Sequence, residues 1–309
     1  MATDEKNLNL SPIESEYDQF GEEVHWLKKF FASLWAQKSA LVGLVILVSV
    51  VFTAIFAKFL SPMDPSEQAL LLNMKPPGFE SGGKVYWFGT DHLGRDLLSR
   101  VIYGSQVSII VGVFSVLISG SVGLILGLIS GFYGGKIDYL LMRLVDFILS
   151  FPFILLALAT INVVGPSLTL IIVVISVRMW TAYARVVRGK VLSLKESEFI
   201  TAAHSIGASN WRILLLHLLP NTLSPVIIIG SLYLGRMIVI EAGLSFLGLG
   251  VPPPRPTWGG ILSEGRNHIY LAWWIVTFPG IAITFTVLGS NMVGDWLRNV
   301  LDPRLRARS

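Results

Sequence analysis

The stretch Glu198–Asn221, EFITAAHSIGASNWRILLLHLLPN, lies between two strongly apolar runs, yet it carries charge, two histidines, a central glycine and a proline near its end. Gly207 fits the position after a helix C-terminus, where the left-handed backbone costs little only for glycine. Ser209 is suited to cap a second helix, and Pro220 to end it. The stretch therefore predicts two short helices joined at Gly207.

The first of these helices has both a start signal and an apolar face. Ser193 followed by Glu196 forms a capping box, which predicts a helix that begins near Leu194. The apolar residues that recur on one face are Phe199, Ala202, Ala203 and Ile206. A segment of this kind, with a face of small residues, is shaped for contact with another protein. An ordinary structured loop is the alternative.

The composition is that of an integral membrane protein. The 309 residues are 53% hydrophobic and only 14% charged, whereas about a quarter of a soluble domain is charged. The chain has no cysteine, which excludes disulfides, thiolate metal sites and a cysteine nucleophile. Its weak basic excess does not indicate nucleic acid as a partner. The polar, acidic N-terminus is unlike a cleavable signal peptide, so we expect the first apolar run to be an uncleaved signal-anchor.

Six apolar runs are long enough to cross a bilayer, which takes about 20 residues per helix. They are Ala40–Phe59, Val107–Phe132, Phe147–Val164, Leu168–Val187, Leu223–Ile240 and Trp273–Val293. An even number of spans places both termini on one side, and that side carries about twice as many Lys and Arg residues as the other. We therefore expect both termini, and the stretch Glu198–Asn221, to be cytoplasmic.

These spans divide the chain into five parts. We expect a cytoplasmic tail at 1–38, a first transmembrane helix at 39–60, an external loop at 61–105, a transmembrane core at 106–297 with a cytoplasmic loop at 188–221 and an external loop at 241–272, and a cytoplasmic tail at 298–309. Within the first tail, the segment HWLKKFFASLWAQK predicts an interfacial amphipathic helix or a simple extension of the first span. The glycines of the second span recur every three or four residues and predict a helix-packing face.

Prolines and tryptophans mark the second external loop. The segment VPPPRPTWGG, residues 251–260, would leave backbone groups unpaired in lipid, which predicts an external loop or a re-entrant cap. Trp258, Trp273 and Trp274 are suited to the level of the lipid headgroups.

The spacing within Glu198–Asn221 resembles the EAA loop of ABC importer permeases. Thr201-Ala202-Ala203, Gly207, His217 and Leu219-Pro220 stand in its register, with Thr201 in place of glutamate and His217 in place of isoleucine. Three further segments are similar to the dipeptide/oligopeptide/nickel permease family, and most of all to its second, or C, subunit. They are FGTDHLGRDLLSRVIYG (88–104), EAGLSFLGLGVPPPRPTWGGIL (241–262) and NMVGDWLRNVLDPRLR (291–306).

This resemblance implies an all-α integral membrane protein with six transmembrane helices, the type I ABC importer permease fold with cytoplasmic coupling helices. It implies a multi-pass protein of the bacterial cell (inner) membrane, surrounded by the lipid bilayer and paired with a homologous second permease as a heterodimer. Two cytoplasmic ABC ATPases would dock on the EAA loops, and an external substrate-binding protein would deliver substrate. ATP and Mg²⁺ would bind to the ATPases, so no cofactor is expected in this chain.

The resemblance also implies which residues contact the ATPase. The residues expected in the coupling loop are Thr201, Ala202, Ala203, Ser205, Gly207, Ala208, Ser209 and Pro220. Because Thr201 replaces the glutamate of the motif, no contact of that glutamate carries over.

Two readings compete for the external motif GTDHLGRD, residues 89–96. In one, Asp91 caps the following helix and Asp96 lies in its early turns. In the other, Arg95 and Asp96 pair with the partner permease or the binding protein. The residues expected on the external face toward these partners are Asp91, Arg95, Asp96, Glu241 and Trp258.

Arg178 lies within the fourth apolar run. An arginine at mid-span costs about 2.5–3.5 kcal/mol on insertion scales unless it finds water or a partner. With Thr181, Ala182 and Arg185 it forms a polar and small stripe at helical spacing. Either Arg178 reaches the headgroups or an ion pair inside the bundle, or the stripe of Arg178, Thr181 and Arg185 lines the translocation path.

Motifs for other function classes are absent. The nearest approach to a P-loop, GFYGGKI at residues 131–137, has the wrong spacing, and Ile137 replaces the hydroxyl that would bind Mg²⁺. No H-E-x-x-H or G-x-S-x-G occurs, and the scattered histidines suggest no metal site. The resemblance implies a transport subunit for short peptides, and the absence of these motifs gives no support for an enzyme.

Two other functions stay open. Nickel or another small solute is the alternative within the family. An ion-coupled secondary transporter is the alternative from a different class, but it calls for carboxylates near the bilayer centre. Here Glu241 and Asp146 lie near the ends of spans.

Overall fold

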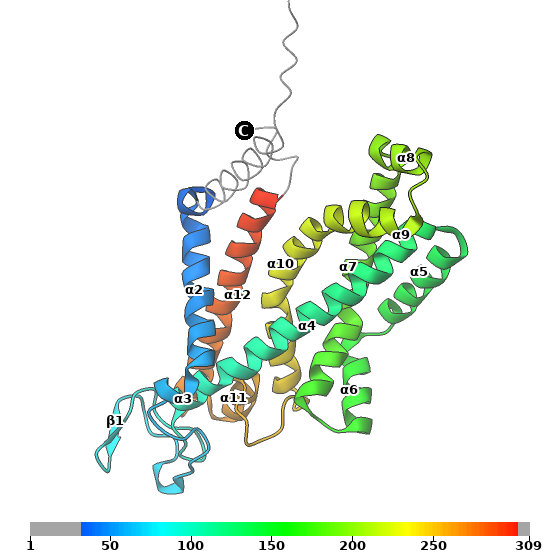
Figure 1. The fold of residues 1–309 in the computed structure, drawn as a ribbon. Coiled ribbons are helices and arrows are strands. Elements are labelled where there is room, and N and C mark those ends of the chain that lie inside the picture. Colours follow the sequence, from blue (N-terminus) through cyan, green and yellow to red (C-terminus); the bar gives the residue numbers. More distant parts are fainter. Residues whose placement is uncertain (1–31, 302–309) are drawn as a thin grey trace, which may run out of the picture.

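The computed structural model of the chain describes residues 32–301, which form a bundle of long helices (Figure 1). Five helices in this range are long and apolar enough to cross a membrane, and there are six spans if one bent pair of helices counts as one. The five are α2 (Lys38–Ile55), α4 (Leu97–Tyr133), α7 (Leu168–Lys195), α10 (Leu219–Phe246) and α12 (Trp274–Leu301). They match five of the six predicted runs, although α4 begins ten residues before Val107.

The predicted third span is not a single helix. Residues 147–164 belong to two helices, α5 (Gly135–Ser150) and α6 (Phe153–Val164), whose axes are bent by 84°. Proline disfavours helical backbone in the residue before it, and Phe151 before Pro152 is extended, with φ −86° and ψ 132°. The prediction of one continuous span over Phe147–Val164 is therefore wrong, because Pro152 ends α5.

Figure 1 shows the start of α2, the end of α12 and α8 (Glu198–Ser205) at the same end of the bundle. Between α8 and α10 lie α9 (Asn210–Arg212) and the π-helical segment η2 (Ile213–Leu218). The predicted interfacial helix lies mostly outside the described residues. Residues 32–36 are helical, and Leu34 packs against Trp296 of α12.

The opposite end of the bundle carries the irregular segments of the chain (Figure 1). They are α3 (Ala57–Leu60), η1 (Leu70–Leu72), the antiparallel strands β1 (Phe79–Ser81) and β2 (Lys84–Tyr86), α11 (Trp258–Gly265) and η3 (Arg266–His268). The hairpin pairs Phe79 with Tyr86 and adds a small sheet to the predicted all-α fold.

The predicted glycine face of α4 packs against α7. A Cβ atom at Gly123 would lie 2.7 Å from the carbonyl oxygen of Trp180, and one at Gly127 would lie 2.7 Å from that of Ala184. Only glycine allows the two backbones to approach this closely. The prediction of a packing face is confirmed at these glycines, whereas Gly134, with φ +64°, belongs to the turn between α4 and α5.

We expect Gly127→Val to destabilise the bundle by about 1–3 kcal/mol or more, because its side chain would overlap the α7 backbone. The measurement is the thermal unfolding midpoint of the detergent-solubilised protein. Gly189→Val is the matched control, since a Cβ atom at Gly189 in α7 meets no atom within 4 Å. Equal shifts for the two variants would contradict the packing argument.

Candidate functional site

The segment between α7 and α10, residues 197–220, is called the α8–α9 segment from here on. Its first helix ends in a Schellman motif, as the sequence predicts. Gly207 has φ +78°, the N–H of Ala208 donates to the carbonyl of Ala203 at 3.0 Å, and the N–H of Gly207 donates to that of His204 at 3.0 Å. These two bonds satisfy carbonyls that the helix end leaves free. The bend after α8 is therefore fixed by the backbone itself.

The second helix begins as predicted and ends differently. The Ser209 hydroxyl accepts a hydrogen bond from the N–H of Arg212 at 3.4 Å, which confirms the predicted cap. The helix does not end at Pro220. Pro220 is the second residue of α10, directly after the π-helical segment η2, and residues 210–246 form one apolar helical stretch.

The predicted start of the first helix is also wrong. Ser193 and Glu196 do not begin a new helix near Leu194, because α7 continues to Lys195 and α8 starts at Glu198 after Ser197. Val191, in the last turns of α7, is fully buried. Its packing holds these turns in α7 and overrides the local capping signal.

A buried apolar cluster anchors the α8–α9 segment to the ends of α4 and α7. Its members are Leu128, Phe132, Val187, Val191, Ile200, Ala203, Ile213, Leu214 and Leu218. Of the predicted apolar face only Ala203 belongs to this cluster, while Phe199, Ala202 and Ile206 are exposed. The segment is thus fixed on one side and presents an apolar surface on the other, with Ile206 86% and Trp211 67% exposed.

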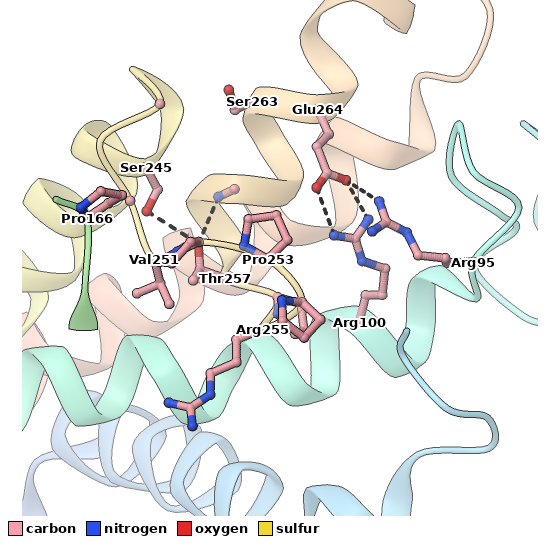
Figure 2. A pocket seen from close by; sticks show the side chains of 16 residues that line it. Arg95, Arg100, Pro166, Ser245, Val251, Pro253, Arg255, Thr257, Ser263 and Glu264 are labelled. Atoms are coloured by element: carbon pink, nitrogen blue, oxygen red, sulfur yellow. Dashed lines mark hydrogen bonds and ion pairs between the residues drawn. The ribbon is translucent and has the colours of Figure 1, made fainter. Parts of the chain in front are cut away.

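The opposite end of the bundle contains a group of four charges, the buried Asp91, Arg95 and Arg100 and the partly exposed Glu264, called the ion cluster below. Figure 2 shows both guanidinium groups directed at the Glu264 carboxylate, Arg100 from the first turn of α4 and Arg95 from the segment just before it. Arg95 donates to Asp91 at 2.6 Å and to Glu264 at 2.7 Å. Arg100 pairs with Asp91 and lies 2.6 Å from Glu264. The cluster ties α4 to α11 beside a cavity of about 330 Å³.

In the structure the two aspartates of the motif GTDHLGRD have roles other than the predicted ones. Asp96, not Asp91, caps α4, since its carboxylate accepts from the N–H of Ser99 at 2.8 Å. Burial alone raises the pKa of Asp91, but Arg100, Arg95 and two backbone N–H groups outweigh it and hold that pKa below its ordinary value. Asp91 is therefore an ionised, fully buried carboxylate. The prediction that Asp91 caps the helix is wrong.

The five residues predicted on the external face toward partners are all buried within this chain. The exposed fractions of Asp91, Arg95, Asp96, Glu241 and Trp258 are 0%, 8%, 2%, 0% and 2%. Glu241 accepts from Ser245 at 2.7 Å, and the Trp258 indole N–H donates to the carbonyl of Val101 at 2.9 Å. These side chains hold the subunit's own elements together and are not its docking surface. Trp274 is likewise buried, and of the three predicted headgroup tryptophans only Trp273 is exposed.

One histidine lies beside the ion cluster. Asp91, His92 and Glu264 each offer a ligand atom within 4.8 Å of the others. Both carboxylates already accept hydrogen bonds from guanidinium groups. The positive charge that a metal ion would supply is therefore already provided by the protein, and the expectation of no metal site stays a prediction.

The predicted stripe on α7 is only partly accessible. Thr181 is 1% exposed, and its hydroxyl donates to the carbonyl of Arg178 at 2.8 Å. Arg185 is exposed and pairs with Asp146 of α5 at 2.7 Å. The prediction that Thr181 shares an open face with the two arginines is wrong, because α7 is packed on that side. Ala182 is partly exposed, so the accessible stripe is Arg178, Ala182 and Arg185.

We expect a membrane-impermeant thiol reagent to distinguish these faces. The chain has no native cysteine, so Arg178→Cys, Ala182→Cys and Arg185→Cys report without background. They are expected to label faster than the matched controls Trp180→Cys and Thr181→Cys, whose positions are buried. Labelling rates in inverted membrane vesicles are the measurement. Equal rates on both faces would contradict the assignment of an accessible stripe.

The fold and the α8–α9 segment define a helical membrane subunit with an exposed, partly apolar segment at one end. Residues 123–307 match the family "Binding-protein-dependent transport system inner membrane component", and residues 26–77 match "N-terminal TM domain of oligopeptide transport permease C". The chain belongs to the first of these families. It is a permease subunit of an ABC importer, a multi-pass membrane protein.

Three curated relatives span almost the whole chain. It is 41% identical to "Di/tripeptide transport system permease protein DppC" of Pseudomonas aeruginosa, over 91% of this chain and 93% of the relative. It is 42% identical to "Dipeptide transport system permease protein DppC" of Alkalihalophilus pseudofirmus, over 94% and 93%. It is 40% identical to "Glutathione transport system permease protein GsiD" of Escherichia coli, over 97% and 96%.

Sequence reasoning missed three residues of these sites. Arg100 and Glu264 complete the ion cluster from 164 residues apart, a separation across which no local pattern pairs them. Arg236, in α10, lies close enough to Arg178 for their charges to interact. Arg236 lies within the predicted span Leu223–Ile240, as Arg178 lies within Leu168–Val187, but the sequence prediction addressed only Arg178.

Proposed function

We propose that this chain forms the translocation path for short peptides together with a homologous second permease. The heterodimer lies in the bacterial inner membrane with both chain termini in the cytoplasm, and two ATPases bind ATP and Mg²⁺ on that side. The supporting observation is the α8–α9 segment, at the same end of the bundle as the start of α2 and the end of α12 (Figure 1). Its backbone-fixed bend and its exposed Ile206 and Trp211 suit it to transmit ATPase closure.

The proposed substrate follows from the relatives. Two of those named above carry di- or tripeptides by name, and the third carries glutathione. Glutathione is the second candidate, and because it is itself a small peptide with free carboxylates, the two candidates share their chemistry. Nickel, the alternative from the sequence, is not named in these three relatives.

The test is uptake by the complete transporter in proteoliposomes. The two permeases, the ATPases and the binding protein of the same gene cluster are reconstituted, and ATP-dependent uptake of a labelled dipeptide, glutathione and Ni²⁺ is compared. We expect dipeptide uptake that requires both ATP and the binding protein. Uptake of Ni²⁺ without dipeptide uptake would overturn the substrate proposal.

We expect the purified chain alone to show no ATP hydrolysis, because the sequence lacks the glycine-rich phosphate cradle and the Mg²⁺-binding hydroxyl of a P-loop. Release of phosphate from ATP is measured for the single chain and for the complete transporter. Turnover by the rigorously purified single chain would contradict the assignment of hydrolysis to partner subunits.

A further inference from the structure

Two arginines lie at matching depth in neighbouring helices of the bundle. Arg178 is ten residues from the start of α7, and Arg236 is ten residues from the end of α10. At a rise of 1.5 Å per residue, Arg178 is about 15 Å from the start of α7 and Arg236 about 15 Å from the end of α10. That distance is half of the hydrocarbon thickness of about 30 Å. If these helix ends lie at the edge of the hydrocarbon layer, both arginines lie near its centre.

Neither arginine has an anionic partner among residues 32–301. Both are missing from the ion pairs of this range, and the Nε atom of Arg178 is buried without any hydrogen-bond partner. Within residues 32–301 the charges of Arg236 and Arg185 both act on Arg178, and both have the same sign as its own. Positive charges at the bilayer centre are costly unless they face water or an anion.

Two tyrosines lie beside Arg236. The Arg236 guanidinium lies 5.4 Å from the ring centroid of Tyr233, a cation–π contact that limits its motion. Tyr233 in turn packs edge-on against Tyr183 of α7 at 5.6 Å. Arg236 is exposed and Arg178 is partly exposed. The Arg236 guanidinium is thus restrained by Tyr233, and both arginines are open to a ligand outside this chain.

We propose that Arg178 and Arg236 bind the C-terminal carboxylate of the peptide as it passes the centre of the membrane. The inference rests on the proposed function. Guanidinium groups bind carboxylates through paired, charge-assisted hydrogen bonds. A free C-terminal carboxylate is common to all unmodified short peptides, so this site recognises them whatever their side chains. An acidic residue of the second permease and a lipid phosphate are the other anions that could reach the pair, and the test separates them from the peptide.

The test compares a labelled peptide that has a free C-terminus with its C-terminal amide. Uptake is measured with saturating, peptide-loaded binding protein, for the wild-type transporter and for Arg178→Gln, Arg236→Gln and Arg236→Lys. For both glutamine variants we expect uptake of the free peptide to fall at least about tenfold and that of the amide to change less than about twofold. Arg236→Lys keeps the positive charge, so we expect a smaller loss of free-peptide uptake than for Arg236→Gln. Arg143→Gln is the matched control, because Arg143 is exposed on α5 and donates to the Tyr139 hydroxyl at 3.2 Å.

A second measurement does not need the binding protein and serves if the binding protein rejects the amide. With Ala182→Cys one turn from Arg178, free peptide is expected to slow thiol labelling at concentrations where the amide does not. Equal loss of uptake for both peptides would overturn the proposal and assign the arginines to an acid of the second permease or to a lipid phosphate. Unchanged uptake would also overturn it. Absence of peptide uptake by the wild-type transporter would instead refute the proposed function.

Discussion

Gly207→Val is expected to abolish coupled transport while the subunit still inserts into the membrane. The native backbone at Gly207 has φ +78°, a conformation that strains a β-branched residue by about 1–2 kcal/mol or more. A Cβ atom there would meet nothing within 4 Å, so the effect comes from the backbone and not from a clash. Relief of that strain rotates α9 relative to α8 and displaces the exposed Ile206 and Trp211.

The measurement is co-purification of the ATPases with the permease pair, together with ATP-dependent uptake. Gly248→Val is the matched control. Gly248 ends α10 in the same Schellman motif at the opposite end of the bundle, with φ +82° and open space around it. It is expected to keep ATPase association. Gly207→Asn is expected to retain part of the activity, because asparagine tolerates the left-handed conformation. Normal transport by Gly207→Val would refute the coupling role of the bend.

The features that the sequence predicts correctly depend on one or a few neighbouring residues. Gly207 was identifiable because a single residue type suits its backbone conformation, and Ser209 because its hydroxyl caps the helix that follows it directly. Most of the membrane helices follow from the length of an apolar run. The glycine face of α4 follows from helical spacing alone. In each case the determining interactions lie within a few turns of the chain.

The predictions that fail depend on contacts between distant segments. Thr181 and Arg178 share a polar stripe in the sequence, but packing around α7 buries Thr181 alone. Spacing fixes which residues share a helix face, and it does not say whether that face meets lipid, water or another helix. The capping signal at Ser193 is local and correct in form, yet burial of Val191 keeps the segment in α7.

The ion cluster shows the same limit for charged residues. From the sequence, Asp91 is a reasonable helix cap, because it stands before an apolar helix. Its partner Arg100 is nine residues away, but the Glu264 that completes the group lies 164 residues beyond Arg100. Asp96 is then free to cap α4. Which aspartate caps and which one pairs is decided by the fold of the whole subunit.

Asp91→Asn is expected to lower the free energy of unfolding by about 3 kcal/mol, because it removes one partner from a buried charge group. The amide of Asn carries two N–H donors where Arg95 and Arg100 also donate. Glu67→Gln is the matched control. Glu67 pairs with Lys84 at 3.6 Å and both side chains are more than half exposed, so less than about 1 kcal/mol is expected. Denaturant unfolding of the solubilised protein is the measurement.

The pH dependence of the destabilisation by Asp91→Asn distinguishes the loss of the carboxylate charge from the loss of its shape. The pKa of Asp91 is lowered in the folded protein, so its charge stabilises the fold fully above the unfolded pKa of about 4. This stabilisation is lost as the pH falls through the lowered folded pKa. The difference in free energy of unfolding between wild type and Asp91→Asn should therefore stay constant from pH 8 to about pH 5 and become smaller below about pH 4. If the difference in free energy of unfolding stays the same in acid, the shape of the carboxylate, and not its charge, joins α4 to α11.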